Sequence, residues 1–487
     1  MGIVLKQSFL NSIVLVLGFA LGALNVLFLY TSFLSESYFG LVTFLTSAAN
    51  ILLPITVLGM QHAVVKFFSS YKSEEERDRF MSLSVLMPIV IAAPASILIT
   101  VFYESILTYL SKENQLIDNY AYLIFILALL MGYFELFFAW SRVQFKTVYG
   151  TIIRELFARL GAFVLLFLVY FEVLSPEQFI YALVFVYALR CLLMAIYALY
   201  LYTPKFSLKL PYNSKEVLLF CIYIFLSGSA TTILLEIDKT MIPQFYELEE
   251  VAFYGVGVYI ALVIGIPSRA MQQIVNPMTA KALNRDDRGL VQQLYTDSSF
   301  YLLMIGGLLF LCININIESI YELTGKPAYK IGIPVVLIIS SVELVKLFLG
   351  NANSILTNSK FYKVFFYVAL AMAIGVVILN KLFIPRLGIA GAAWATFAVV
   401  AISAGIKIVF LSLKMNFSLS IGRSLKLLGI IASLFVAFNY FPIWTSPLID
   451  IILKSLLIAL SYFIALRILG LSPDLNSLKN SFSEKSK

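Results

Sequence analysis

The sequence predicts an all-α membrane protein that crosses a lipid bilayer many times. Of its 487 residues, 61% are hydrophobic and only 13% are charged, and the mean hydropathy is +0.93. Soluble globular domains carry about 25% charged residues, so most of this surface must face lipid. The apolar runs are about 20 residues long, as a spanning helix requires, whereas the strands of a membrane barrel alternate over about 10 residues.

Fourteen spanning helices are expected along the chain. The first apolar run, Phe9–Leu34, extends well past the weak signal-peptide-like "ALGA" at Ala20–Ala23, so we interpret it as an uncleaved first span. Proline interrupts several later spans, which is tolerated where a helix lines protein or a water-filled cavity. The expected centres lie near residues 21, 50, 91, 130, 163, 188, 226, 263, 306, 340, 371, 399, 433 and 459.

Lysine and arginine predict the orientation of the chain. If the N-terminus is cytoplasmic, 27 of the 35 Lys and Arg residues fall in cytoplasmic segments, six fall on the opposite face and two fall inside spans. Cytoplasmic loops of membrane proteins carry such an excess. We therefore expect both termini in the cytoplasm, and we attribute the net charge of +8 to topology rather than to nucleic-acid binding.

The chain is expected to contain two similar halves. "YFG" at Tyr38–Gly40 and "FYG" at Phe253–Gly255 open spans six apart, Glu135-Leu136 matches Glu343-Leu344, and Pro176 matches Pro385. Such internal repeats are typical of transporters that bind their substrate between the halves. The predicted parts are an N-terminal lobe (1–202), a cytoplasmic linker (203–215), a C-terminal lobe (216–415), two further helices (416–472) and a cytoplasmic tail (473–487).

The residue patterns of enzymes are mostly missing. Gly325-Lys326 lacks the first glycine of a P-loop, because Ile320 stands in its place. The three cysteines lie in apolar runs and His62 is the sole histidine, so neither a zinc site nor a disulfide framework is expected. We expect no catalytic residue, no metal and no cofactor.

Basic residues inside or beside spans are candidates for binding an anion, because a charge near the bilayer centre costs at least about 2.5–3.5 kcal/mol. Arg190 lies deep in the sixth span and either pairs structurally with Glu135 or binds an anion in a central cavity. Other basic residues gather near the expected cytoplasmic end, where they serve as interfacial anchors or as ligands of a lipid phosphate. These residues are Lys66, Arg154, Arg159, Arg269 and Lys281.

Acidic residues near the spans are candidates for coupling transport to an ion. Glu135 is the one acid deep in the fourth span. Glu236, Asp238 and Lys239 cluster at the expected outer end of the seventh span. Glu135 or Asp238 could carry a coupling proton or cation, or either could simply form a structural ion pair.

A run of small residues in the twelfth span predicts close helix packing. Small residues let helices approach one another in lipid, where the hydrophobic effect does not drive their association. This face either packs statically or marks the place where a lobe closes. The residues are Gly388, Gly391, Ala392 and Ala393.

Two segments resemble a known family, the polysaccharide flippases of the multidrug/oligosaccharidyl-lipid/polysaccharide exporter superfamily. "FIPRLGIAGAAWAT" (Phe383–Thr396) is similar to the start of helix 12 in that family. "LLEIDKTMIPQFYELEEVAFYGVGVYIA" (Leu234–Ala261) is similar to its helix 7–8 junction, with Asp238 in a family-like place. The resemblance covers nearly the whole chain and implies two six-helix lobes around a central cavity.

The resemblance also implies a function and its setting. It implies a flippase of the bacterial cytoplasmic membrane that moves an undecaprenyl-diphosphate-linked oligosaccharide between leaflets by alternating access, for O-antigen or another surface polysaccharide. The implied partners are this lipid-linked substrate, membrane lipids, and a polysaccharide polymerase with its chain-length regulator. Two alternatives stay open: a multidrug or cation antiporter of the same fold and, less favoured, an integral-membrane polysaccharide polymerase.

Overall fold

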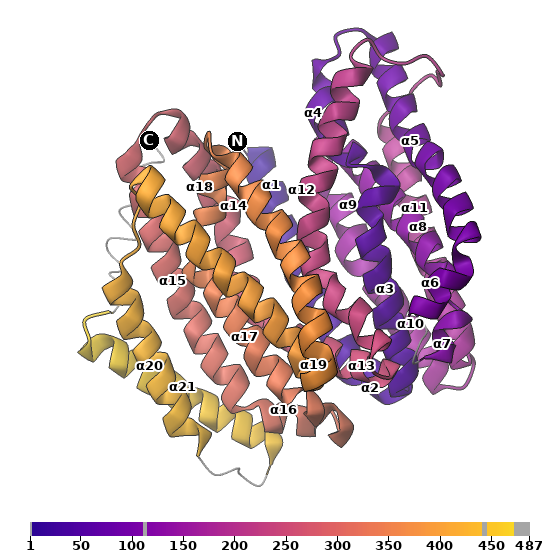
Figure 1. Ribbon diagram of the computed structural model, residues 1–487. Coiled ribbons are helices and arrows are strands. Elements are labelled where there is room, and N and C mark those ends of the chain that lie inside the picture. The colour runs from indigo at the N-terminus through magenta and orange to yellow at the C-terminus, as the bar shows by residue number, and fades with distance from the viewer. Residues whose placement is uncertain (1, 111–113, 441–445, 472–487) are drawn as a thin grey trace. The chain divides into compact units, whose positions relative to one another are not determined.

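The computed structural model (Figure 1) describes residues 2–110, 114–440 and 446–471, and every regular element in these ranges is a helix. The predicted all-α class is therefore confirmed. The chain forms two compact units: unit 1 comprises residues 1–259 and 366–399, and unit 2 comprises residues 260–365 and 400–487. The predicted tail over 473–487 lies outside the described residues. The predicted lobe boundaries stay a prediction.

Twelve candidate spans occur among the described residues, judged by length and composition, so the predicted count of fourteen is not confirmed. The difference arises at two places. The predicted fifth span consists of α9 (Thr147–Ile152), the π-helical η3 (Ile153–Phe157) and α10 (Ala158–Tyr170), and several charged residues interrupt its apolar character. The predicted eleventh and twelfth spans form one continuous helical element, α19 (Tyr362–Met415).

Unit 1 is a helical bundle in which α8 packs against both α3 and α11 (Figure 1). Its core includes Phe134 and Trp140 of α8, together with Phe80, Met194 and Cys221 from neighbouring helices. Its further elements are α1 (Gly2–Leu24), η1 (Asn25–Leu29), α2 (Tyr30–Phe33), α3 (Glu36–Val57), α4 (Met60–Phe67), η2 (Phe68–Ser70), α5 (Glu74–Val101), α6 (Tyr103–Leu110), α7 (Gln115–Asp118), α8 (Tyr122–Val143), α11 (Pro176–Leu201), α12 (Ser214–Met241), η4 (Ile242–Gln244) and most of α13 (Leu248–Ala261).

Serine residues set the starts of three helices in unit 1. The side chains of Ser35, Ser73 and Ser175 each accept a hydrogen bond from a backbone N–H in the first turn of α3, α5 and α11. Ser175 and Gln178 form a complete capping box, and Pro176 follows at the first helical position. The local sequence thereby fixes where these three helices begin.

Unit 2 packs α17, α20 and α21 around α15 (Figure 1). Its core includes Leu303, Leu347, Ile431 and Tyr462, whereas apolar residues such as Leu456 stay exposed, as expected for a lipid-facing surface. Besides parts of α13 and α19, its elements are η5 (Leu262–Gly265), α14 (Ile266–Asn284), α15 (Arg288–Ile315), α16 (Ile317–Leu323), η6 (Pro327–Gly332), α17 (Ile333–Phe348), α18 (Ala352–Asn358), α20 (Ile421–Asn439) and α21 (Pro447–Ile468).

The helical element α19 is a hairpin of two antiparallel arms. A Cβ atom built on Gly375 would lie 3.4 Å from Cγ2 of Val399. In a straight helix, these two positions would be separated by about 36 Å. Gly388 has φ +61° and ψ −146°, which breaks the helical geometry. The chain therefore reverses near Gly388, and each arm has enough residues to cross a bilayer.

The predicted small-residue face serves the turn of this hairpin. A Cβ atom on Gly391 would lie 2.3 Å from the carbonyl oxygen of Phe383, so only glycine fits there without a shift of the backbone. A Cβ on Gly388 would meet open space, so its glycine is required by the left-handed backbone alone. Ala392 and Ala393 are fully buried.

Candidate functional site

Two adjoining cavities lie within unit 1. The first, which we call the Arg154 cavity, has a volume of about 360 Å³ and is lined by residues of α3, α4, α8, η3 and α12. The second, the Arg159 cavity, has a volume of about 380 Å³ and is lined mainly by η1, α2, α3, α10, α11 and α12. Asn50 of α3 lines both. The two cavities therefore meet along α3.

Two π-helical segments contribute polar groups to these cavities. Asn25 begins η1, and Arg154 lies in η3. The amide Nδ2 of Asn25 donates a hydrogen bond of 2.8 Å to the backbone oxygen of Arg159 and so ties η1 to the first turn of α10, directly after η3. Single π-helical turns inside α-helices are rare and occur frequently at functional sites. The irregular backbone at this depth lines protein cavities, as membrane proteins require.

Cations outnumber carboxylates in the lining of the two cavities. The basic residues are Arg142 and Arg154 in the first cavity, and Arg159 and Lys239 in the second. The carboxylates are Glu135 in the first and Glu236 in the second. The lining thus has an excess of positive charge, which favours an anionic ligand.

The arginines are held by long or shared ion pairs. Nε of Arg154 lies 3.5 Å from Oε1 of Glu135 and 3.8 Å from Oε1 of Glu155. Nη1 of Arg159 lies 2.9 Å from Oε2 of the same Glu155. The side chain of Arg154 is 44% exposed. Both carboxylate contacts are measured at Nε, and the exposed side chain leaves the guanidinium accessible to a ligand.

Arg190 of α11 lies in an aromatic setting beside the cavities. Its guanidinium carbon is 3.8 Å from the ring centroid of Phe134, and its Nε has no hydrogen-bond partner among the described residues. Tyr187, one turn earlier on the same helix, lines the Arg159 cavity. The structural pair between Arg190 and Glu135 is not formed within 4.0 Å, because Glu135 pairs with Arg154 and Arg190 stacks on the aromatic ring.

The other predicted basic residues do not line either cavity. Lys66 is exposed on α4, with its Nζ 4.1 Å from the ring centroid of Phe220. Arg269 and Lys281 are exposed on α14 of unit 2. Of the six predicted basic residues, the structure brings Arg154 and Arg159 into the cavities and places Arg190 beside them.

Asp238 forms a buried junction of its own. It is 3% exposed and accepts hydrogen bonds from the hydroxyl of Tyr254 (2.5 Å), from Nδ2 of Asn380 (2.8 Å) and from the hydroxyl of Thr396 (2.8 Å). Tyr254 belongs to α13, and the other two donors belong to opposite arms of the α19 hairpin. Asp238 thus joins α12 to three other helical segments.

The predicted cluster of Glu236, Asp238 and Lys239 is divided by the geometry of α12. Glu236 and Lys239 form an ion pair and line the Arg159 cavity. Asp238 lies outside this cavity lining and bonds to the α19 hairpin. Residues two positions apart on a helix do not share a face. Residues that are close in sequence therefore belong partly to the Arg159 cavity and partly to the contact with the α19 hairpin.

Replacing Asp238 by alanine is expected to lower the free energy of unfolding by about 3 kcal/mol or more. Three donors would lose their acceptor in a buried site, and each unsatisfied group costs about 1–3 kcal/mol. Asp238→Asn keeps an acceptor oxygen and should cost less. Thermal unfolding of the purified variants checks this order, and an unchanged midpoint for Asp238→Ala would show that the junction contributes no stability.

We expect His62 to make the stability of the folded protein modestly dependent on pH. It lines the Arg154 cavity, and its pKa lies below the ordinary value of 6.5, first because the surrounding protein partly desolvates the imidazole and second because of the charge of Arg142, partly opposed by Glu135. The folded protein therefore binds this proton less readily than the unfolded chain, so stability is lost as the pH falls below about 6.5. Unfolding midpoints from pH 8 to 5 should fall more steeply for the wild type than for His62→Gln, and parallel curves would contradict this expectation.

The fold is similar to those of a flippase and of transporters of known structure. The structure is similar to the lipid II flippase MurJ in an inward closed conformation, with a TM-score of 0.75 and 16% identity over 95% of this chain and 99% of that chain. It is also similar to an inward-facing multidrug resistance MATE family transporter of the MOP superfamily (TM-score 0.61, 11% identity, 84% and 94% coverage). A MOP superfamily transporter from Pyrococcus furiosus matches with a TM-score of 0.58 and 11% identity over 84% of this chain and 96% of that chain.

The sequence then identifies the family. The model of the polysaccharide biosynthesis protein family matches residues 4–284, which is more than half of the chain. The chain therefore belongs to the polysaccharide biosynthesis protein family. No curated protein matches the chain in sequence. The solved structures to which the fold is similar are those of a flippase and of transporters.

Sequence reasoning missed several polar residues of the cavities. Asn25 and Asn50 lie in apolar runs, where an amide is expensive unless it is satisfied, and this signal could have found them. Arg142 is counted in the sequence only within the general excess of cytoplasmic cations. Composition cannot separate a cavity arginine from an interfacial one, because both occur near the ends of spans.

Proposed function

We propose that this protein is a flippase that moves an undecaprenyl-diphosphate-linked oligosaccharide from the cytoplasmic to the outer leaflet of the bacterial cytoplasmic membrane. The observation that carries this proposal is the cation excess in the two cavities of unit 1. Its support is the polysaccharide biosynthesis family and the flippase-like fold. The translocated unit would serve O-antigen, capsule or exopolysaccharide synthesis, with a polymerase and a chain-length regulator acting afterwards.

The cavity arginines bind the diphosphate in this mechanism. Guanidinium groups recognise phosphate oxygens with paired, charge-assisted hydrogen bonds. Arg142, Arg154 and Arg159 supply these contacts, and Arg190 adds positive charge beside the cavities. Volumes of about 360 and 380 Å³ lie in the range of small-molecule sites. They suit the phosphates and the first sugars, while the long hydrocarbon stays in the bilayer.

The remaining predicted basic residues act during approach of the substrate. Lys66, Arg269 and Lys281 are exposed, so they attract the diphosphate from the cytoplasmic side rather than hold it. Both termini lie in the cytoplasm in this arrangement, as the excess of Lys and Arg predicts. Translocation then follows alternating access, with the binding site opening to one leaflet at a time.

Glu135 is the better candidate for a coupling acid. It lines the Arg154 cavity, and its ion pair with Arg154 is 3.5 Å long. A diphosphate that engages Arg154 competes with this ion pair, so binding and the charge state of Glu135 are linked. Asp238, in contrast, is closed in by three donors. We assign Asp238 to the structural junction.

A deletion strain tests the proposed function in the cell. Cells that lack this protein, and that hold no second flippase, should accumulate undecaprenyl-linked repeat units on the cytoplasmic leaflet. A plasmid copy of the wild type should restore surface polysaccharide, whereas an Arg142→Gln/Arg154→Gln copy made in equal amount should not. Normal surface polysaccharide in the deletion strain would refute the proposal.

A multidrug or cation antiporter is the second candidate, because the fold is also similar to a MATE family transporter. The cation excess of the cavities opposes the binding of a cationic drug. Ethidium efflux from vesicles that contain the purified protein would favour this alternative. We expect no efflux above that of protein-free vesicles.

A further inference from the structure

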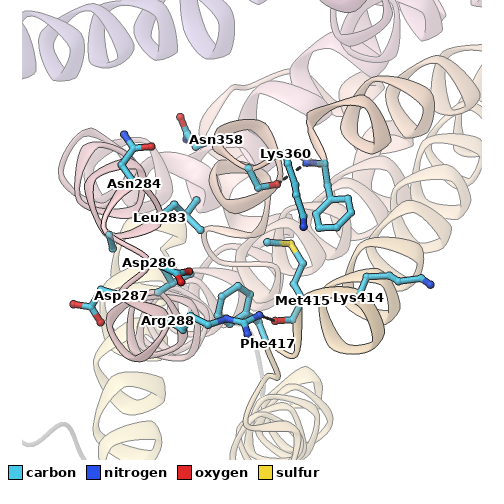
Figure 2. A pocket seen from close by; sticks show the side chains of 14 residues that line it. Leu283, Asn284, Asp286, Asp287, Arg288, Asn358, Lys360, Lys414, Met415 and Phe417 are labelled. Atoms are coloured by element: carbon cyan, nitrogen blue, oxygen red, sulfur yellow. Dashed lines mark hydrogen bonds between the residues drawn. The ribbon is translucent and has the colours of Figure 1, made fainter.

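A separate pocket lies within unit 2 where three connecting segments meet. It has a volume of about 500 Å³ and is lined by the segments between α14 and α15, between α18 and α19, and after α19 (Figure 2). We call it the Lys360 pocket. Its charged lining residues are Asp286, Asp287, Arg288, Lys360 and Lys414.

An apolar groove meets this pocket at Lys414. The groove has a volume of about 560 Å³ and is lined by Ile402, Gly405, Ile406 and Leu413, with further apolar residues of the second α19 arm. These positions share one face of the helix. Lys414 lines both the groove and the pocket. The two together form a site with a charged end and a hydrocarbon-lined end.

The lysines of the pocket are free to bind an anion, whereas Arg288 is already engaged. Nη2 of Arg288 donates a hydrogen bond of 2.8 Å to the backbone oxygen of Met415 and so anchors the end of α19. Asp287 caps α15 by accepting a hydrogen bond from the N–H of Leu290. In the described part of the chain, no carboxylate lies within 4.0 Å of the amines of Lys360 or Lys414.

A third lysine strengthens the positive character of this region. Lys407 lies two helical turns before Lys414 on the same side of α19. It is only 6% exposed, and its Nζ is 5.5 Å from the ring centroid of Phe365. No acid pairs with Lys407 among the described residues within 4.0 Å. A buried cation inside a membrane segment is costly and usually functional.

We propose that the Lys360 pocket and the α19 groove together bind one acidic glycerophospholipid, with its phosphate at Lys360 and Lys414 and an acyl chain along the groove. The pairing of cationic and apolar surfaces matches the two ends of such a lipid. Positive side chains near the cytoplasmic surface attract anionic lipids of that leaflet. The site does not involve the cavities proposed for the substrate.

Native mass spectrometry of the full-length protein in detergent tests the headgroup part of the proposal. Titration with phosphatidylglycerol should give an affinity about 10-fold higher than titration with phosphatidylcholine. Lys360→Gln/Lys414→Gln should remove this preference. Lys363→Gln is the control, because Lys363 is exposed at the start of the first α19 arm, three residues after Lys360, but does not line the pocket. Equal binding of the two lipids by the wild type, or an equal loss in the control, would overturn the proposal.

The groove is tested by filling it. A Cβ atom on Gly405 meets nothing within 4 Å, so Gly405→Leu fits without strain and fills the groove. It should weaken phosphatidylglycerol binding several-fold. Gly429→Leu, equally unhindered on α20, should leave binding unchanged. A final titration adds inorganic phosphate to the lipid-bound protein. If phosphate displaced the lipid completely and Gly405→Leu had no effect, the pocket would be a site for free phosphate instead of a phospholipid. Lipid binding is the readout, so failure of the flippase proposal would not affect it.

Discussion

The double variant Arg142→Gln/Arg154→Gln is expected to lower translocation about 100-fold at normal membrane abundance. A charge-assisted hydrogen bond to a phosphate contributes about 1.5–3 kcal/mol, and each 1.36 kcal/mol is a factor of ten. Both side chains are exposed to the cavity, so their loss leaves little buried charge unpaired and spares the fold. Initial rates in proteoliposomes, normalised to the amount of reconstituted protein, measure the effect.

Arg467→Gln is the matched control for this experiment. Arg467 is exposed in the last turn of α21 and makes no ion pair within 4.0 Å among the described residues. Arg467→Gln is the same type of substitution and removes one positive charge, and the rate should change by no more than about twofold because exposed charges contribute little. A double cavity variant as active as this control would show that the cavities of unit 1 do not bind the transported phosphate.

Gly391→Ala is expected to destabilise the folded protein by about 3 kcal/mol or more. The added Cβ would lie 2.3 Å from the carbonyl oxygen of Phe383, 2.5 Å from its carbonyl carbon and 2.9 Å from N of Ile384. These contacts are with backbone atoms, so no side-chain rotation relieves them, and the hairpin turn must open. Overpacking of this kind typically costs about 1–3 kcal/mol and more where the backbone must move.

Gly429→Ala separates the effect of crowding from the effect of losing a glycine. Gly429 lies in α20, and a Cβ built there meets nothing within 4 Å. Because alanine has the higher helix propensity, this change should be neutral or stabilising by up to about 1 kcal/mol. The yield of monodisperse protein and the midpoint of thermal unfolding compare the two variants. Equal midpoints would mean that the turn is not closely packed at Gly391.

The fold class could be predicted because the solvent of this protein shapes its composition. A chain that must satisfy its backbone hydrogen bonds in lipid forms long apolar helices, and the hydropathy reports them directly. The turn of the α19 hairpin was harder to interpret. "PRLG" at Pro385–Gly388 predicts a boundary between two spans, but hydropathy does not show that Gly388 bends the chain while Gly391 makes the close contact.

The candidate site could be predicted only in part, because its contacts join residues far apart in sequence. Asp238 was identified as an unusual acid, but its partners Asn380 and Thr396 lie 142 and 158 positions later. Glu135 was matched with Arg190, although the structure pairs it with Arg154. Both arginines lie near Glu135 by depth, and only the rotation of the helices decides between them. The π-helical turn that carries Arg154 has no signature in the sequence.

Translocation by the purified protein tests the proposed flippase activity most directly. The full-length chain is reconstituted into liposomes with a fluorescent undecaprenyl-diphosphate oligosaccharide, and a membrane-impermeant reductant reports which leaflet holds the label. The wild type is expected to move the label between leaflets within minutes, and the Arg142→Gln/Arg154→Gln variant is expected to stay near the rate of protein-free liposomes. Wild-type liposomes that are no faster than protein-free ones would contradict the proposal that this protein flips lipid-linked sugars.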